Sequence, residues 1–126
     1  MSVGKSEEEG LRAREFERLL DTETAYVDNL MKPPEIEPKM KYMSIMNKKE
    51  LDETGTLLIK KTGDLLLRFN SLSQHYKIGL FDKLMKYVEK FRKLLEKYGK
   101  KIGVASFSIN VGFPWGVSIS LTFEVK

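Results

Sequence analysis

The fold is decided by residues 104–125, which read VASFSINVGFPWGVSISLTFEV. Every odd position from 105 to 125 is apolar, whereas positions 106–110 and 118–124 carry serine, asparagine, threonine or glutamate at each even number. Alternation with a period of two is typical of strands that share one apolar face. We therefore predict an amphipathic β-hairpin over about 104–125.

The turn between the two strands also predicts how they pair. When Val111 is placed opposite Val117, apolar residues meet on one face as far as Ala105 opposite Phe123, and small polar residues meet on the other. A slip by one residue would turn the serines toward the core, so this register is favoured.

The hairpin is also a candidate surface for partners. Its polar face carries almost no charge, and its edges lack the lysines that usually discourage pairing with another strand. We expect a homo-oligomer, with a self-assembling structural protein as one alternative function, and we name Phe113 and Trp115 at the tip as partner contacts. A membrane-active hairpin is the least favoured alternative, and contact with a membrane is not expected.

Two long amphipathic helices are predicted. Residues 6–9 (SEEE) fit a capping box, and an apolar stripe then continues until Pro33, which gives a helix at about 7–32. A second stripe ends before Gly99, which stands where a left-handed C-cap belongs, and gives a helix at about 80–98.

Residues 47–76 admit two interpretations. As a helix, their apolar residues keep a four-three spacing, and Asn47 with Glu50 would cap it. As a hairpin over 56–69, Leu57 and Ile59 share one face, and the turn falls at 61–64. Two glycines and three threonines would each cost a helix up to about 1 kcal/mol. We adopt the hairpin and keep the helix as the alternative.

Together these elements predict an α+β fold. An antiparallel sheet is built on the C-terminal hairpin and joined by the 56–69 hairpin, with the two long helices packed on its apolar face. The 126 residues have room for one core, so residues 1–126 are expected to form a single domain. No disulfide contributes, because the chain has no cysteine.

The basic segment is the functional lead. Residues 80–101 hold eight basic and three acidic residues, whereas residues 1–32 hold five basic and eight acidic ones. A row of six lysines steps by three and four along the second helix: Lys83, Lys86, Lys90, Lys93, Lys97 and Lys100. Such a row can follow the phosphates of a nucleic acid or another polyanion. We expect contact that does not depend on base sequence, because the basic segment contains little arginine and the sequence has no helix-turn-helix signature.

The alternative is that this row is an ordinary solvated face. Glu89 and Glu96 lie on the same helix, and the acidic first helix could fold against it. Either source of negative charge would neutralise the lysines.

Catalysis is not expected. His75 is the only histidine, which excludes sites that need two imidazoles. The sequence has no glycine-rich phosphate loop, nucleophile elbow or acidic metal cluster. We predict a non-enzymatic binding or structural protein with no catalytic residues, no metal site and no cofactor.

Composition indicates the setting of the protein. Abundant lysine and glutamate with one glutamine, one histidine and no cysteine are typical of heat-adapted organisms, so we expect a protein of a thermophile or of one of its viruses. The N-terminal residues lack the apolar stretch of a secretory signal. The predicted location is the cytoplasm, or for a viral protein the host cytoplasm or the virion.

Overall fold

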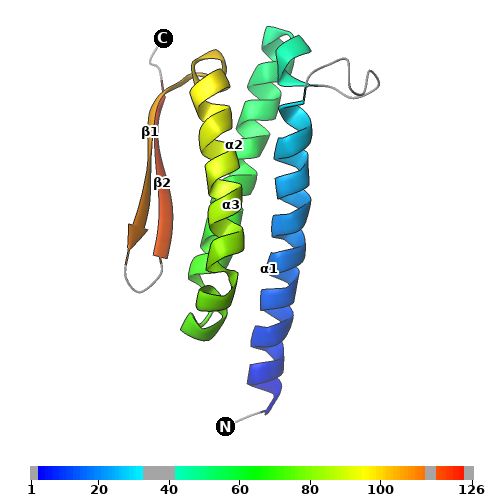
Figure 1. Ribbon diagram of the computed structural model, residues 1–126, viewed down its shortest axis with the longest axis vertical. Coiled ribbons are helices and arrows are strands. Elements are labelled where there is room, and N and C mark those ends of the chain that lie inside the picture. Colours follow the sequence, from blue (N-terminus) through cyan, green and yellow to red (C-terminus); the bar gives the residue numbers. More distant parts are fainter. Residues whose placement is uncertain (1–2, 33–41, 113–115, 124–126) are drawn as a thin grey trace.

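Three long helices and a two-stranded sheet make up the computed structural model, which describes residues 3–32, 42–112 and 116–123 (Figure 1). The helices are α1 (Val3–Leu30), α2 (Lys48–Asn70) and α3 (Gln74–Tyr98). Short 3-10 helices, η1 (Met43–Ile45) and η2 (Gly99–Ile102), precede α2 and follow α3. The strands β1 (Val104–Gly112) and β2 (Gly116–Phe123) form an antiparallel hairpin. The predicted α+β class is confirmed.

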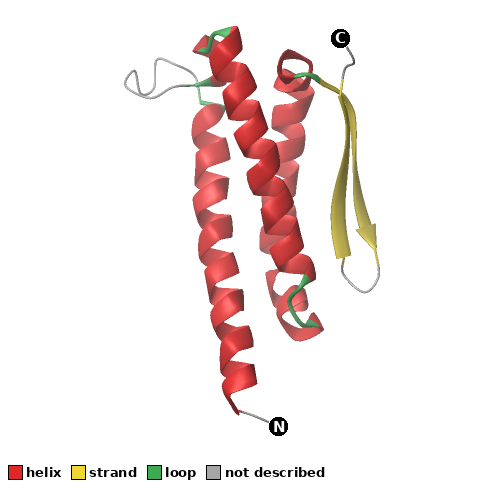
Figure 2. Cartoon of the chain, turned by 180° about the vertical axis from the view of Figure 1, so that it is seen from behind, coloured by secondary structure: helices red, strands yellow, loops and turns green. Residues whose placement is uncertain are grey.

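The helices form an antiparallel bundle with the hairpin along one side. α2 runs opposite to α1 and α3, and the hairpin lies beside α2 and α3, away from α1 (Figures 1 and 2). β2 is the strand that contacts α2, and β1 contacts η2 at the end of α3. Of the two predicted helices, α3 therefore lies near the sheet, whereas α1 lies across the bundle.

The core lies where the three helices meet. Its largest fully buried side chains include, from the helices in order, Phe16, Leu20, Val27, Leu58, Leu65, Phe69, Leu84, Tyr87, Phe91 and Leu94. Each such residue contributes roughly 1.5–3 kcal/mol by leaving water. The buried Val104 and Val117 join the hairpin to the same cluster.

The ends of α1 and α3 differ from the predicted ones. α1 begins at Val3, so Ser6 lies inside the helix and the predicted capping box is wrong, because an N-cap must precede the first helical residue. α3 begins at Gln74, well before residue 80. Gly99 has a helical φ of −53°, and the chain continues through η2 to Gly103, whose φ of 86° supplies the left-handed turn.

Residues 48–70 form one continuous helix. The predicted hairpin over 56–69 is therefore wrong, and the helical alternative is confirmed. The Asn47 side chain accepts from Glu50 N at 2.8 Å, and the Glu50 carboxylate accepts from Asn47 N at 3.3 Å, which makes a capping box. The buried residues keep the four-three spacing: Leu51, Gly55, Leu58, Thr62, Leu65, Leu66 and Phe69.

Two residues that argued against this helix have roles in packing. A Cβ atom on Gly55 would lie 2.8 Å from Ile102 Cβ, so the glycine lets η2 approach α2 closely. Thr62 Oγ1 lies 2.6 Å from Tyr87 Oη, which satisfies a buried hydroxyl on each helix. These tertiary contacts offset the low helix propensity of glycine and threonine.

The predicted strand register is confirmed along most of the hairpin. Val111 lies opposite Val117, and Phe107 lies opposite Leu121. Phe107, Ile109 and Leu121 pack against the helical core, whereas the exposed face carries Ser106, Ser108, Asn110, Ser118, Ser120 and Thr122.

The register changes at the start of β1. A bulge between Val104 and Ser106 places Val104, rather than Ala105, opposite Phe123. Val104 is buried and Ala105 is exposed, so the larger side chain takes the place in the core. The predicted pairing of Ala105 with Phe123 is therefore wrong, because burying valine removes more apolar surface from water.

Candidate functional site

Two lysines of the predicted row are paired with α1. Lys83 Nζ lies 2.5 Å from Glu17 Oε2 and 3.7 Å from Asp21 Oδ1. Lys90 Nζ lies 2.7 Å from Asp28 Oδ1. The hydrogen bond to Glu17 is the main cause that raises the pKa of Lys83 above its usual value. The acidic helix thus neutralises the basic one at these two positions.

The other four lysines of the row have no ion-pair partner among the described residues. All are exposed, and we call them the lysine ridge: Lys86, Lys93, Lys97 and Lys100. At a rise of 1.5 Å per helical residue, the ridge is about 20 Å long. Its positive charges are open to solvent and to an anion.

Two glutamates beside the ridge are bound by Arg92. Arg92 Nε donates to Glu89 Oε2 at 2.9 Å, and the same guanidinium pairs with Glu96. The hydrogen bond from Arg92 is the main cause that lowers the pKa of Glu89, and the charge of Lys93 adds to the effect. The glutamates are therefore engaged mainly with an arginine, and the ridge keeps most of its charge.

A fifth exposed lysine, Lys101, lies next to the end of the ridge. Its Nζ lies 5.7 Å from the centre of the Tyr98 ring, and Lys97 Nζ lies 5.5 Å from the same ring. A cation at this distance is attracted to an aromatic face. The predicted row continued from Lys97 by a step of three to Lys100 and so left out Lys101. Lys101 lies four residues after Lys97, and this spacing was the available signal.

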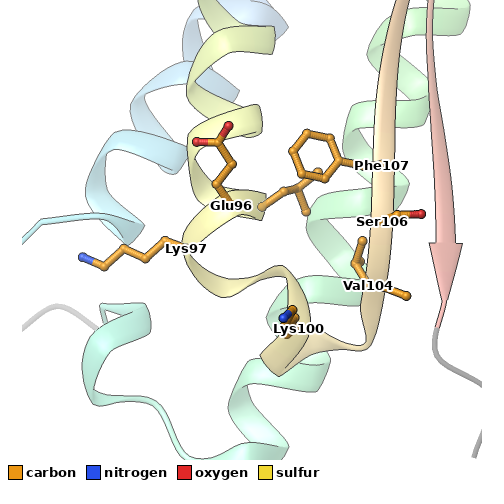
Figure 3. A pocket seen from close by; sticks show the side chains of 8 residues that line it. Glu96, Lys97, Lys100, Val104, Ser106 and Phe107 are labelled. Atoms are coloured by element: carbon orange, nitrogen blue, oxygen red, sulfur yellow. The ribbon is translucent and has the colours of Figure 1, made fainter.

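A groove of about 380 Å³ opens between the end of α3 and the start of β1 (Figure 3). Its helical wall is formed by Leu95, Glu96, Lys97 and Lys100, and its other wall by the consecutive residues 104–107. Beyond the bulge, Ser106 and Phe107 point to opposite faces of the strand, so a groove that both of them line runs along the strand edge. Phe107 points toward α3 in this view. The groove therefore combines a basic rim with an edge of the sheet.

The two edges of the hairpin differ. Each strand has one edge that faces away from the other strand, which we call its outer edge. At the outer edge of β2, Asn70 Nδ2 donates to Val117 O at 3.0 Å, and Val117 N donates to Asn70 Oδ1 at 3.1 Å. Asn70 is the last residue of α2, so its side chain holds the hairpin to the bundle as a neighbouring strand would. Along the outer edge of β1, the ranges that the structure describes supply no such partner.

A buried polar cluster joins the three helices. Glu23 of α1 is only 8% exposed, and its Oε1 lies 3.4 Å from Lys61 Nζ of α2. Its Oε2 is buried and forms no hydrogen bond with any described group. Beside it, burial raises the pKa of Tyr87 to about 12, with Thr62 opposing this and Glu23 adding to it. Sequence reasoning missed this cluster, because charged residues at such spacing usually face solvent.

The remaining residues named from the sequence lie apart from the ridge. Phe113 and Trp115 lie outside the described residues. His75 is exposed at the other end of α3, with its ring centre 5.2 Å from that of Tyr76. Across residues 3–32, 42–112 and 116–123, no three His, Asp or Glu side chains gather as metal ligands would. Within the same ranges, none of the helices combines the length and apolar character required to cross a membrane.

Comparison with known proteins assigns no family to the chain. It matches no protein-family model, no curated protein and no solved structure. The features that bear on function are therefore the ridge, the groove and the strand edge.

Proposed function

We propose that the protein is a non-enzymatic binding protein that contacts nucleic acid through the lysine ridge. The observation that carries this proposal is the division of the six lysines. Lys83 and Lys90 are held by α1, whereas the four ridge lysines are exposed and have no ion-pair partner in the described part of the chain. A polyanion that binds such a row releases the counterions of its phosphates, which favours association.

The chemistry of the ridge favours contact with phosphates over reading of bases. A lysine ammonium is a flexible point charge, whereas guanine is best recognised by a planar arginine fork. Arg92 is the one arginine of α3, and it is bound to Glu89 and Glu96. We therefore expect binding that depends little on base sequence.

Binding to random-sequence duplex DNA at several salt concentrations tests the proposal. If the four ridge lysines contact phosphates, the logarithm of the association constant should fall with the logarithm of salt concentration at a slope of about −3.6. Replacing two of them, Lys86→Gln with Lys93→Gln, should reduce the slope to about −1.8.

The matched control is Lys83→Gln with Lys90→Gln. It removes the same charge from the same helix, but at lysines that α1 already holds. We therefore expect this control variant to show the same salt slope as the unaltered protein. Absence of binding at low salt, or equal losses in the two double variants, would contradict the proposal.

A further inference from the structure

We infer that the outer edge of β1 is a docking site for an extended acidic peptide segment, which adds as a third strand in the groove beside α3. This inference goes beyond the proposed contact with nucleic acid. It rests on the strand edge, and it involves the ridge only at Lys97 and Lys100.

The hydrogen bonds of Asn70 identify which main-chain groups point outward. Both the N–H and the C=O of Val117 face Asn70, so neither bonds to β1. Residues of an antiparallel pair alternate between bonded and non-bonded positions. Because Val117 lies opposite Val111, the outward groups of β1 include those of Phe107 and Ile109. These groups have no hydrogen-bond partner within the described ranges.

The edge of β1 lacks the features that usually protect a strand. Charged side chains, prolines and bulges prevent pairing in most edge strands. The exposed residues of β1 between 106 and 110 are Ser106, Ser108 and Asn110, which carry no charge. The bulge at Val104 lies at the very start of the strand. From Ser106 onward, β1 presents a regular row of donors and acceptors.

The charge of the groove indicates which strand fits. Lys97 and Lys100 line it, and the carboxylate of Glu96, on the same wall, is paired with Arg92. An added strand places the residues that bond to Phe107 and Ile109 on the same face as these two side chains, which is the face toward α3. Glutamates at those positions would approach Lys100, whereas the Lys97 ammonium points away from β1 and lies over the Tyr98 ring (Figure 3). The charge of Lys100 is therefore complementary to an acidic strand.

A second copy of this chain suits the groove less well. Antiparallel pairing of two β1 strands about a twofold axis would place the helices of both copies on the same side of the joined sheet. Each copy would then bring the basic lining of its own groove to the joined sheet, so the pairing would add positive charge without a complementary negative charge. A slender acidic peptide brings the opposite charge and no helix.

The test uses a fluorescein-labelled synthetic peptide of alternating glutamate and threonine, titrated into the whole chain. We expect saturable binding by fluorescence anisotropy, together with slower hydrogen exchange at the amides of Phe107 and Ile109. The amides of Ser106 and Ser108 already bond to β2, so their exchange should change little. The same peptide with N-methylated glutamates keeps its charge but loses the donors that face β1, and we expect it to bind at least about tenfold more weakly.

Charge reversal separates this site from the nucleic-acid site. Lys97→Glu with Lys100→Glu should weaken peptide binding by about tenfold. Lys86→Glu with Lys93→Glu, farther along the ridge, should leave peptide binding within about twofold and still weaken DNA binding. A failure of the proposed peptide site can thus be distinguished from a failure of the proposed nucleic-acid site.

Two results would overturn the inference. One is equal binding of the N-methylated peptide, or binding without protection of Phe107 and Ile109, because the attraction would then be by charge alone. The other is protection of these amides in the protein by itself, increasing with its concentration. That result would place a second copy at the edge, as in the homo-oligomer expected from the sequence.

Discussion

The hydroxyl groups of Thr62 and Tyr87 lie 2.6 Å apart between α2 and α3, and both residues are buried. Tyr87→Phe should lower the free energy of unfolding by about 1–3 kcal/mol, because the Thr62 hydroxyl loses its partner in a place that water does not reach. Thr62→Val should cost a similar amount. The double variant should lose less than the sum, as measured by urea denaturation. Additive losses would mean that the two groups do not interact.

The same tyrosine gives the protein a pH dependence at high pH. Burial raises the pKa of Tyr87 to about 12, whereas an unfolded tyrosine titrates near 10. Between these values the unfolded state loses its proton and the folded state keeps it, so rising pH favours unfolding. The contribution of Tyr87 should be constant below about pH 10 and then fall by about 1.4 kcal/mol per pH unit up to about pH 12. The difference in slope between the unaltered protein and Tyr87→Phe isolates this effect, which equal slopes would disprove.

Two glycines of α2 should respond in opposite ways to the same substitution. Gly55→Ala should destabilise the protein by about 1–3 kcal/mol, because the new Cβ would lie 2.8 Å from Ile102 Cβ. Gly63 is exposed and has nothing within 4 Å of its Cβ position. Gly63→Ala should therefore stabilise the helix by roughly 0.5–1 kcal/mol. Thermal unfolding of both variants measures the contrast, and a gain from Gly55→Ala would refute the close contact.

The buried carboxylate of Glu23 should make Lys61 important for stability. Lys61→Met leaves this charge without its partner, and we expect a loss of about 1–2 kcal/mol, reduced by the partial exposure of Lys61. Adding Glu23→Leu should recover most of the loss, since no buried charge then remains. Lys48→Met is the control, because Lys48 and Asp52 are both exposed and should contribute less than about 0.5 kcal/mol. Equal losses at Lys61 and Lys48 in denaturant titrations would exclude a special role for Glu23.

The hairpin was predictable because its pattern has one solution. The apolar odd positions and the polar even ones allow no slip between Ser106 and Ser118 without burying a serine. At Val104 and Ala105 the alternation does not indicate which side chain is buried, since both residues are apolar. The choice there depends on which side chain fills the core, and that information lies in the helices.

α2 was harder to predict because its signals conflict locally. Gly55, Thr62 and Gly63 together resemble strand and turn residues. Gly55 and Thr62 suit this helix because they contact Ile102 and Tyr87, which lie far along the chain. A local reading of propensity includes neither contact.

The candidate site was predictable only in part. Helical spacing was enough to place the six lysines near one another on α3. Which of the lysines remain without an ion pair depends on how α1 packs against α3, because Glu17 and Asp28 of α1 pair with Lys83 and Lys90. No spacing within α3 contains that information, and the groove beside β1 likewise arises only when two elements meet.

The hydrogen bonds between Asn70 and Val117 join residues 47 positions apart in the chain. Helices form from local contacts within about a microsecond, whereas this contact has to wait for a long loop to close. The hairpin should therefore dock late in folding, onto helices that are already paired. During synthesis all three helices leave the ribosome before the hairpin does. The nascent chain then passes through a stage in which the surface that receives β2 is uncovered, and Asn70 makes its hydrogen bonds to Val117 only after β2 has been synthesised.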